Sequence, residues 1–198
     1  MTPRQTARLQ EKIKQIKAAL AADKKRWGGF YDDSRGLRYL PPRYYLQLGD
    51  YAGGLRYVKW FHKNFEDDCG FPDFLFEWTV ILFKTGKLKD AAQKAFQTYC
   101  RNTYLFDKFF ARPIVPIEKG EYSNLEIPSY VNYFTYSHLQ PDLADFSEWL
   151  QALISSEKFI SASAQFVEIQ KRLKTEEVGA VRSFLVDQGL MMERSFSV

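Results

Sequence analysis

Two histidines and two cysteines are the residues of this 198-residue chain best suited to metal binding or nucleophilic catalysis. They are His62, Cys69, Cys100 and His138. Structural zinc sites are marked by closely spaced pairs such as C-x₂₋₄-C, and no such pair occurs here. We therefore predict no metal site. Without a CxxC motif or a disulfide framework, the two cysteines are typical of ordinary thiols in a reducing compartment.

An acidic cluster, Glu66-Asp67-Asp68 with Asp73, is the second candidate for chemistry, as a cation site. Calcium loops of the D-x-[DN]-x-[DN]-G type end in a bidentate Glu, and both features are missing here. We therefore interpret this cluster as a solvated loop that caps the following helix.

Local catalytic motifs are absent from the sequence. It contains no G-x-S-x-G, G-x-x-x-x-G-K-[ST], G-x-G-x-x-G or H-E-x-x-H. With two histidines and no Cys/His neighbours, general-base or nucleophilic catalysis would need an unconventional set of residues. We expect a protein that is not an enzyme and that has no cofactor, and we keep an enzyme with a scattered site as the least favoured alternative.

The composition is that of an ordinary globular protein, with 45% hydrophobic and 26% charged residues. The longest apolar stretch, "FLFEWTVILF" (74–83), contains Glu77 and is shorter than the roughly 20 residues of a membrane helix. Residues 1–26 lack the apolar core of a signal peptide. These features predict a cytoplasmic protein without a membrane span.

The first element that the sequence predicts is a basic N-terminal helix, in the segment 1–30. Its apolar residues recur at spacings of four, three and four and form a narrow stripe, Leu9, Ile13, Ile16 and Leu20. The stripe must dock either on the body of the protein or on a partner helix. Residues 1–43 hold 11 Lys/Arg against 4 Asp/Glu, which is typical of a solvated helix face or of a nucleic-acid contact through Lys12, Lys14, Lys17, Lys24, Lys25 and Arg26.

Two helical hairpins are predicted between residues 38 and 110. The first begins at Pro41-Pro42 and turns at Gly49, and the second begins at Pro72 and turns at Gly86. The two turns are 37 residues apart, within the range of stacked helix-pair repeats. In the second hairpin, the i, i+3, i+4 stripe Leu88, Ala91, Ala92, Ala95, Phe96 and Tyr99 predicts a helix that approaches its neighbour closely.

The second hairpin, "LFEWTVILFKTGKLKDAAQKAF", resembles a tetratricopeptide repeat. Leu75 and Trp78 stand at large positions of the first helix, Gly86 stands at the turn, and Ala91 and Ala95 stand at packing positions of the second helix. "YYLQLGDYAGGLRYVKWF" resembles a degenerate first copy, so the resemblance covers roughly residues 38–105. The usual repeat has about 34 residues, so three extra residues lengthen the loop between the copies.

The resemblance implies a concave groove that binds a peptide or a partner helix. Its lining positions correspond in this sequence to Tyr39, Arg43, Leu46, Gln47, Phe76, Val80, Phe83 and Lys84. Alternatively, the chain itself fills the groove, either with the apolar stripe of its N-terminal helix or with the connection at residues 111–128.

The remaining sequence predicts an extended, proline-containing connection (111–128) and a C-terminal helical region (129–198) packed on the same body. We expect a short aromatic helix at 103–110, a helical turn or two near Tyr130, helices at 142–154 and 157–174, and a last helix at 175–190. The last helix would have Thr175 as its N-cap and Val178, Val181 and Leu185 on one side. This half also resembles the C-terminal parts of uncharacterised bacterial tetratricopeptide-like proteins.

Together these features predict an all-α chain of tetratricopeptide-like helix pairs that serves as a protein–protein interaction or scaffold module. The alternative is a nucleic-acid-associated factor that uses the basic N-terminal helix.

Overall fold

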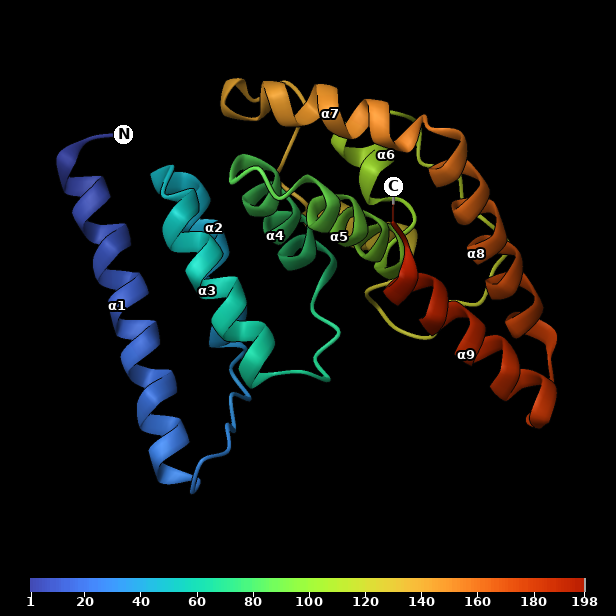
Figure 1. Ribbon diagram of the computed structural model, residues 1–198, viewed down its shortest axis with the longest axis horizontal. Coiled ribbons are helices and arrows are strands. Elements are labelled where there is room, and N and C mark those ends of the chain that lie inside the picture. Colours follow the sequence, from blue (N-terminus) through green and yellow to red (C-terminus); the bar gives the residue numbers. More distant parts are fainter. Residues whose placement is uncertain (198) are drawn as a thin grey trace. The chain divides into compact units, whose positions relative to one another are not determined.

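Helices and loops make up the computed structural model, which describes residues 1–197 (Figure 1). Because no β-strand occurs among those residues, the predicted all-α class is confirmed. The chain divides into two compact units, Met1–Gly70 and Phe71–Val198, and this boundary lies between the two predicted hairpins. None of the described helices is long and apolar enough to cross a membrane.

The first unit begins with helix α1 (Pro3–Arg26). Thr2 and Gln5 form a capping box at its start, in which each side chain accepts a hydrogen bond from the other residue's backbone N–H. Helix α1 packs on α2 (Pro41–Leu48) and on the 3₁₀ helix η1 (Leu37–Tyr39), and the predicted apolar stripe is buried at this contact. Leu9 is partly buried, and Ile13, Ile16 and Leu20 are buried.

The predicted first hairpin consists of α2 and α3 (Tyr51–Asn64). Gly49 ends α2 with φ 67°, a left-handed conformation that glycine adopts without steric cost. Asp50 then caps α3 by accepting a hydrogen bond from the Gly53 N–H at 2.8 Å. A Cβ atom on Gly53 would lie 2.1 Å from Asp50 Oδ2 and 2.6 Å from Tyr45 Cε1, so a larger residue here would force the Asp50 cap and the Tyr45 ring to move.

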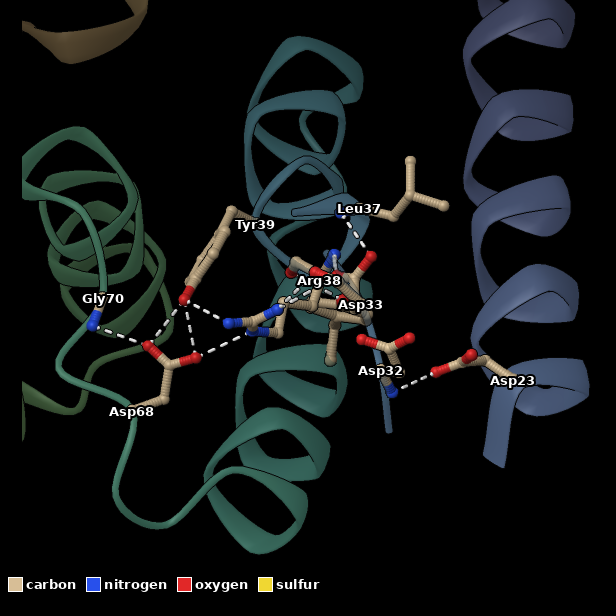
Figure 2. Close-up of polar contacts among 9 residues, drawn as sticks. Asp23, Asp32, Asp33, Leu37, Arg38, Tyr39, Asp68 and Gly70 are labelled. Atoms are coloured by element: carbon tan, nitrogen blue, oxygen red, sulfur yellow. Dashed lines mark hydrogen bonds and ion pairs between the residues drawn. The ribbon is translucent and has the colours of Figure 1, made fainter. Parts of the chain in front are cut away.

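A polar network holds the connection between α1 and α2 in place (Figure 2). Asp68, from the loop after α3, accepts hydrogen bonds from the Tyr39 hydroxyl at 2.6 and 2.7 Å and from Arg38 Nε at 2.7 Å. Arg38 also pairs with Asp33, Nη1 to Oδ2, at 3.3 Å. The Asp32 N–H donates to Asp23 of α1 at 2.7 Å. The network therefore ties the connection to α1 at one end and to the loop after α3 at the other.

The second unit is organised around α4 (Pro72–Lys84) and α5 (Leu88–Arg101), which pack along each other (Figure 1). Gly86 turns the chain between them with φ 72°. The three alanines of the predicted stripe are at most 1% exposed, which agrees with a close approach of the two helices.

Aromatic rings fill the centre of this unit. Phe76 of α4 contacts Phe109 of α6 (Leu105–Phe109), Phe134, and Phe146 of α7 (Ala144–Ile154), with ring centroids 4.9 to 5.5 Å apart. A loop segment, 111–127, follows α6. Two short 3₁₀ helices, η2 (Pro128–Tyr133) and η3 (Pro141–Leu143), lie between that segment and α7. The helical turns predicted near Tyr130 correspond to η2.

The chain closes with α8 (Glu157–Thr175) and α9 (Ala180–Ser195), which pack on each other and on α5. The predicted start of the last helix at Thr175 is wrong. Thr175 is the last residue of α8, and α9 begins after Gly179, because the residues between do not continue the helix. Val178 is accordingly 96% exposed, whereas Leu185 is fully buried.

Candidate functional site

The side chains predicted to line the groove on the second hairpin are covered by, or paired with, other residues of the second unit. Phe76 and Val80 are fully buried, and Phe76 lies within the aromatic cluster described above. Phe83 packs on Phe146 and Trp149, with ring centroids 5.5 and 5.0 Å apart. Lys84 forms an ion pair with Asp145. The contacts of α6 and α7 thus take up the face of α4 on which a peptide would have to lie.

The positions predicted on the first hairpin have mixed environments. Tyr39 belongs to the Asp68 network, and burial together with the Asp68 carboxylate raises its pKa. Leu46 is buried and Arg43 is partly buried. Gln47 is the one residue of the predicted groove set that is exposed. Neither hairpin therefore presents the set of exposed side chains that the resemblance implies.

An open cleft of about 820 Å³ lies instead in the first unit, between α1, the connection after it and α3. Its volume is within the usual range for ligand sites. Its walls combine basic and aromatic side chains with three small residues, and none of the lining residues is acidic. They are Lys17, Ala21, Lys24, Lys25, Gly28, Gly29, Tyr31, Arg56, Tyr57 and Trp60.

Of the four cationic side chains in the cleft, two contact neighbouring side chains, and the other two are available to bind a ligand. Lys24 Nζ donates to Asn64 Oδ1 at 2.9 Å and lies 5.1 Å from the centre of the Tyr31 ring. Lys17 Nζ lies 5.6 Å from the centre of the Tyr45 ring. Lys25 and Arg56 are exposed, and within residues 1–197 their side chains form neither a hydrogen bond nor an ion pair.

Aromatic rings form the other component of the cleft. The rings of Tyr31 and Trp60 meet edge to face with their centroids 6.0 Å apart, and the ring centroids of Tyr57 and Trp60 are 5.3 Å apart. At the same connection, two further rings point to solvent, because Trp27 is 48% and Phe30 is 78% exposed. Large rings left in water beside cations are a surface feature that marks binding sites for planar or apolar groups.

The fold explains how these residues come together. Gly28 and Gly29 have φ values of 61° and 105°, a backbone conformation that lets the chain turn sharply after α1. Asn64, in the last turn of α3, accepts hydrogen bonds from both Lys24 and the Tyr31 hydroxyl. The Asp23–Asp32 contact in Figure 2 holds the connection against α1. Contacts within the first unit therefore determine the shape of the cleft.

Sequence reasoning named part of this site. Three of the six predicted basic residues, Lys17, Lys24 and Lys25, line the cleft. Of the others, Lys12 lies over the Tyr44 ring, Arg26 lies over the Trp27 ring, and Lys14 is exposed. Arg56 and Trp60 were missed because they belong to α3. The available signal was their spacing of four residues, which places a cation and an indole on one helix face.

The histidines and cysteines remain scattered in space as well as in sequence. Within residues 1–197, no three His, Cys, Asp or Glu side chains are grouped so that they could hold a metal ion. His138 Nδ1 lies 3.0 Å from the Phe109 carbonyl oxygen. Burial raises the pKa of the Cys100 thiol well above its ordinary value, which disfavours the nucleophilic thiolate.

Comparison of the chain with models of known protein families, with curated proteins and with solved structures found no match.

Proposed function

We propose that the chain is a binding module for single-stranded nucleic acid and that the basic aromatic cleft of the first unit is the binding site. The observation that supports this proposal is the cleft's composition of four cations and three aromatic rings without a carboxylate. The proposed role is binding rather than catalysis.

Single-stranded nucleic acids carry the two features that this cleft complements. Their phosphates are attracted by cations such as Lys25 and Arg56, and their unstacked bases have flat faces that stack on aromatic rings. The surrounding charge also favours a polyanion. Residues 1–70 contain 14 Lys/Arg and 8 Asp/Glu, whereas residues 71–198 contain 14 and 16, so the positive charge is concentrated in the unit that carries the cleft.

The test is fluorescence anisotropy of a labelled single-stranded oligonucleotide with the whole chain. We expect binding that weakens steeply as salt rises from about 50 to 200 mM. The double variant Lys25→Glu/Arg56→Glu should bind at least about tenfold more weakly, with a shallower salt dependence, because two phosphate contacts are lost.

A matched control keeps the charge change and moves it away from the cleft. Lys59→Glu/Lys63→Glu alters two exposed lysines of α3 that do not line the cleft, and it should lose less affinity than the cleft variant. Trp27→Ala should weaken binding without altering the salt slope, since stacking carries no counterion release. Equal losses in the two charge-reversal variants would overturn the assignment to the cleft.

A partner protein is the second candidate ligand. The two helix pairs, α2–α3 and α4–α5, each turn at a left-handed glycine, and this arrangement supports a tetratricopeptide-like interaction module. An acidic, extended segment would then be the part of the partner that enters the cleft. This candidate would be favoured if a polyglutamate peptide bound the wild type more tightly than the oligonucleotide does and if Lys25→Glu/Arg56→Glu abolished the binding of that peptide.

A further inference from the structure

A second cavity, of about 320 Å³, lies within the second unit. Its walls come from the C-terminal end of α5, the segment 119–126, α8 and α9, helices that pack on one another (Figure 1). The volume is at the small end of the range for small-molecule sites. All of its lining residues belong to the second unit, so the cavity is independent of the cleft described above.

The cavity has an apolar side. Phe166 and Leu173 of α8 are buried there, and Val186 and Leu190 of α9 also belong to the lining. Val186 and Leu190 are also 42% and 38% exposed, so the cavity opens to solvent along α9. A hydrocarbon chain could enter at this opening and be removed from water by these four side chains.

The cavity also has a cationic side, formed by Arg101, Lys119 and Arg182. Lys119 is 4% exposed and pairs with Glu121 at 3.3 Å. Arg182 Nη1 donates to two backbone carbonyl oxygens, those of Leu173 and Glu176, at 2.7 and 2.9 Å. These carbonyl acceptors are neutral, and the centre of the Tyr122 ring lies 5.4 Å from Arg182 Cζ, so within residues 1–197 no carboxylate pairs with Arg182.

Arg101 gives the more specific indication of a ligand. Its Nη2 donates to both carboxylate oxygens of Glu193 at 3.0 and 3.2 Å. Its Nε is buried and has no acceptor among the described residues. A buried donor without an acceptor is unfavourable, and an incoming oxygen would remove that cost.

We propose that this cavity binds an amphipathic carboxylate, a short acyl chain that ends in a carboxyl group. The chain would lie against Phe166, Leu173, Val186 and Leu190, and the carboxylate would accept hydrogen bonds at the cationic side, with Arg101 Nε as one donor. The lining also contains Glu126 and Glu193. Glu126 accepts from Tyr122 N–H and Glu193 accepts from Arg101, so these two carboxylates are already hydrogen-bonded.

The probe is sodium decanoate below its micelle-forming concentration, titrated calorimetrically into the whole chain. We expect saturable binding of one decanoate, and binding at least about tenfold weaker for decanol, which lacks the charge, and for acetate, which lacks the chain. Binding of decanol as tight as that of decanoate would overturn the role of the cationic side. Inorganic phosphate binding in place of decanoate would overturn the assigned ligand class.

Two variants separate the two sides of the cavity. Arg101→Lys keeps the charge opposite Glu193 but removes the Nε–H donor, and it should weaken decanoate binding while leaving the weak affinity for decanol unchanged. Leu190→Asp places a carboxylate at the opening and should abolish binding. The matched control is Val181→Asp, which makes the same kind of change at an exposed position of the same helix outside the cavity and should bind as the wild type does. Binding that survives Leu190→Asp would overturn the proposal.

Discussion

At the scale of single residues, Lys94 of α5 shows how burial alters a charged side chain. Its ammonium lies 3.9 Å from the centre of the Trp78 ring of α4, and it donates to Gln97 Oε1. Burial lowers the pKa of Lys94 to about 8, Glu193 opposes this shift, and Arg101 adds to it. The residue is therefore a titrating group within the range of ordinary buffers.

The expected consequence is a rise in stability with pH. A lysine in the unfolded chain keeps its ordinary pKa of 10.5, so between about pH 8 and pH 10.5 the unfolded chain binds more protons at this site than the folded chain. Stability then increases with pH over that interval. We expect the contribution of Lys94 to the free energy of unfolding to rise by roughly 2 kcal/mol between about pH 7.5 and pH 9.5.

Urea denaturation at several pH values, with Lys94→Met and Lys89→Met as variants, measures this effect. Lys94→Met should remove the rise, whereas Lys89→Met, at an exposed position of the same helix, should retain it. Parallel pH profiles for the wild type and Lys94→Met would contradict the assignment.

Residues whose conformation is set locally could be predicted from the sequence, and residues defined by contacts across the fold could not. Gly49 and Gly86 were predicted as turns from their position between apolar runs, and both have positive φ. The contact of Lys94 with Trp78 and the joint placement of Lys25 with Arg56 depend on how separate helices pack. No local pattern in the sequence encodes that packing.

At the scale of elements, the connection between α1 and α2 is the part on which the cleft depends. It supplies Gly28, Gly29 and Tyr31 to the lining, and it contains no helix until η1. Besides a few backbone hydrogen bonds in turns, its conformation rests on side-chain contacts. Asp68 is central to them, because its carboxylate accepts from Arg38, Tyr39 and the Gly70 N–H (Figure 2).

We expect Asp68→Asn to loosen this connection. The substitution keeps the size of the side chain but removes the charge that Arg38 faces, and hydrogen bonds to charged groups contribute about 1.5–3 kcal/mol. The free energy of unfolding of the first unit should fall by roughly 2 kcal/mol, and oligonucleotide affinity should fall with it. Asp67→Asn, at the exposed neighbouring position, should change stability by less than about 0.5 kcal/mol.

Denaturation and anisotropy on the same samples measure both quantities. Unchanged affinity in a destabilised Asp68→Asn variant would show that the network stabilises the unit without shaping the cleft.

Helix periodicity explains why the elements could be predicted better than the site. The amphipathic patterns of α1, α3, α5 and α8 repeat over several turns, so their existence follows from the sequence. The start of α9 was misplaced because Thr175-Glu176-Glu177 has the composition of a helix start, yet α8 continues through Thr175. The predicted groove was a family expectation, and the aromatic residues that pack on Phe76 and Phe83 come from α6, α7 and Phe134, outside the resemblance.

At the scale of the whole molecule, the two proposed ligands belong to different units. The cleft residues lie within Met1–Gly70, and the residues of the second cavity lie within Phe71–Val198. A ligand stabilises the part of a protein to which it binds by RT ln(1 + [L]/Kd), which is about 2.7 kcal/mol at a hundredfold excess over Kd. Amide hydrogen exchange can locate this stabilisation along the chain.

We expect each ligand to slow exchange in its own unit. A single-stranded oligonucleotide should protect amides within residues 1–70, most of all in α1, the connection and α3, and decanoate should protect amides of α5, α8 and α9. Lys25→Glu/Arg56→Glu should lose the first effect and keep the second, and Leu190→Asp should do the reverse. Protection of the second unit by the oligonucleotide in the Lys25→Glu/Arg56→Glu variant would place the nucleic-acid site outside the cleft. The same experiment therefore checks both proposals, and each can fail without the other.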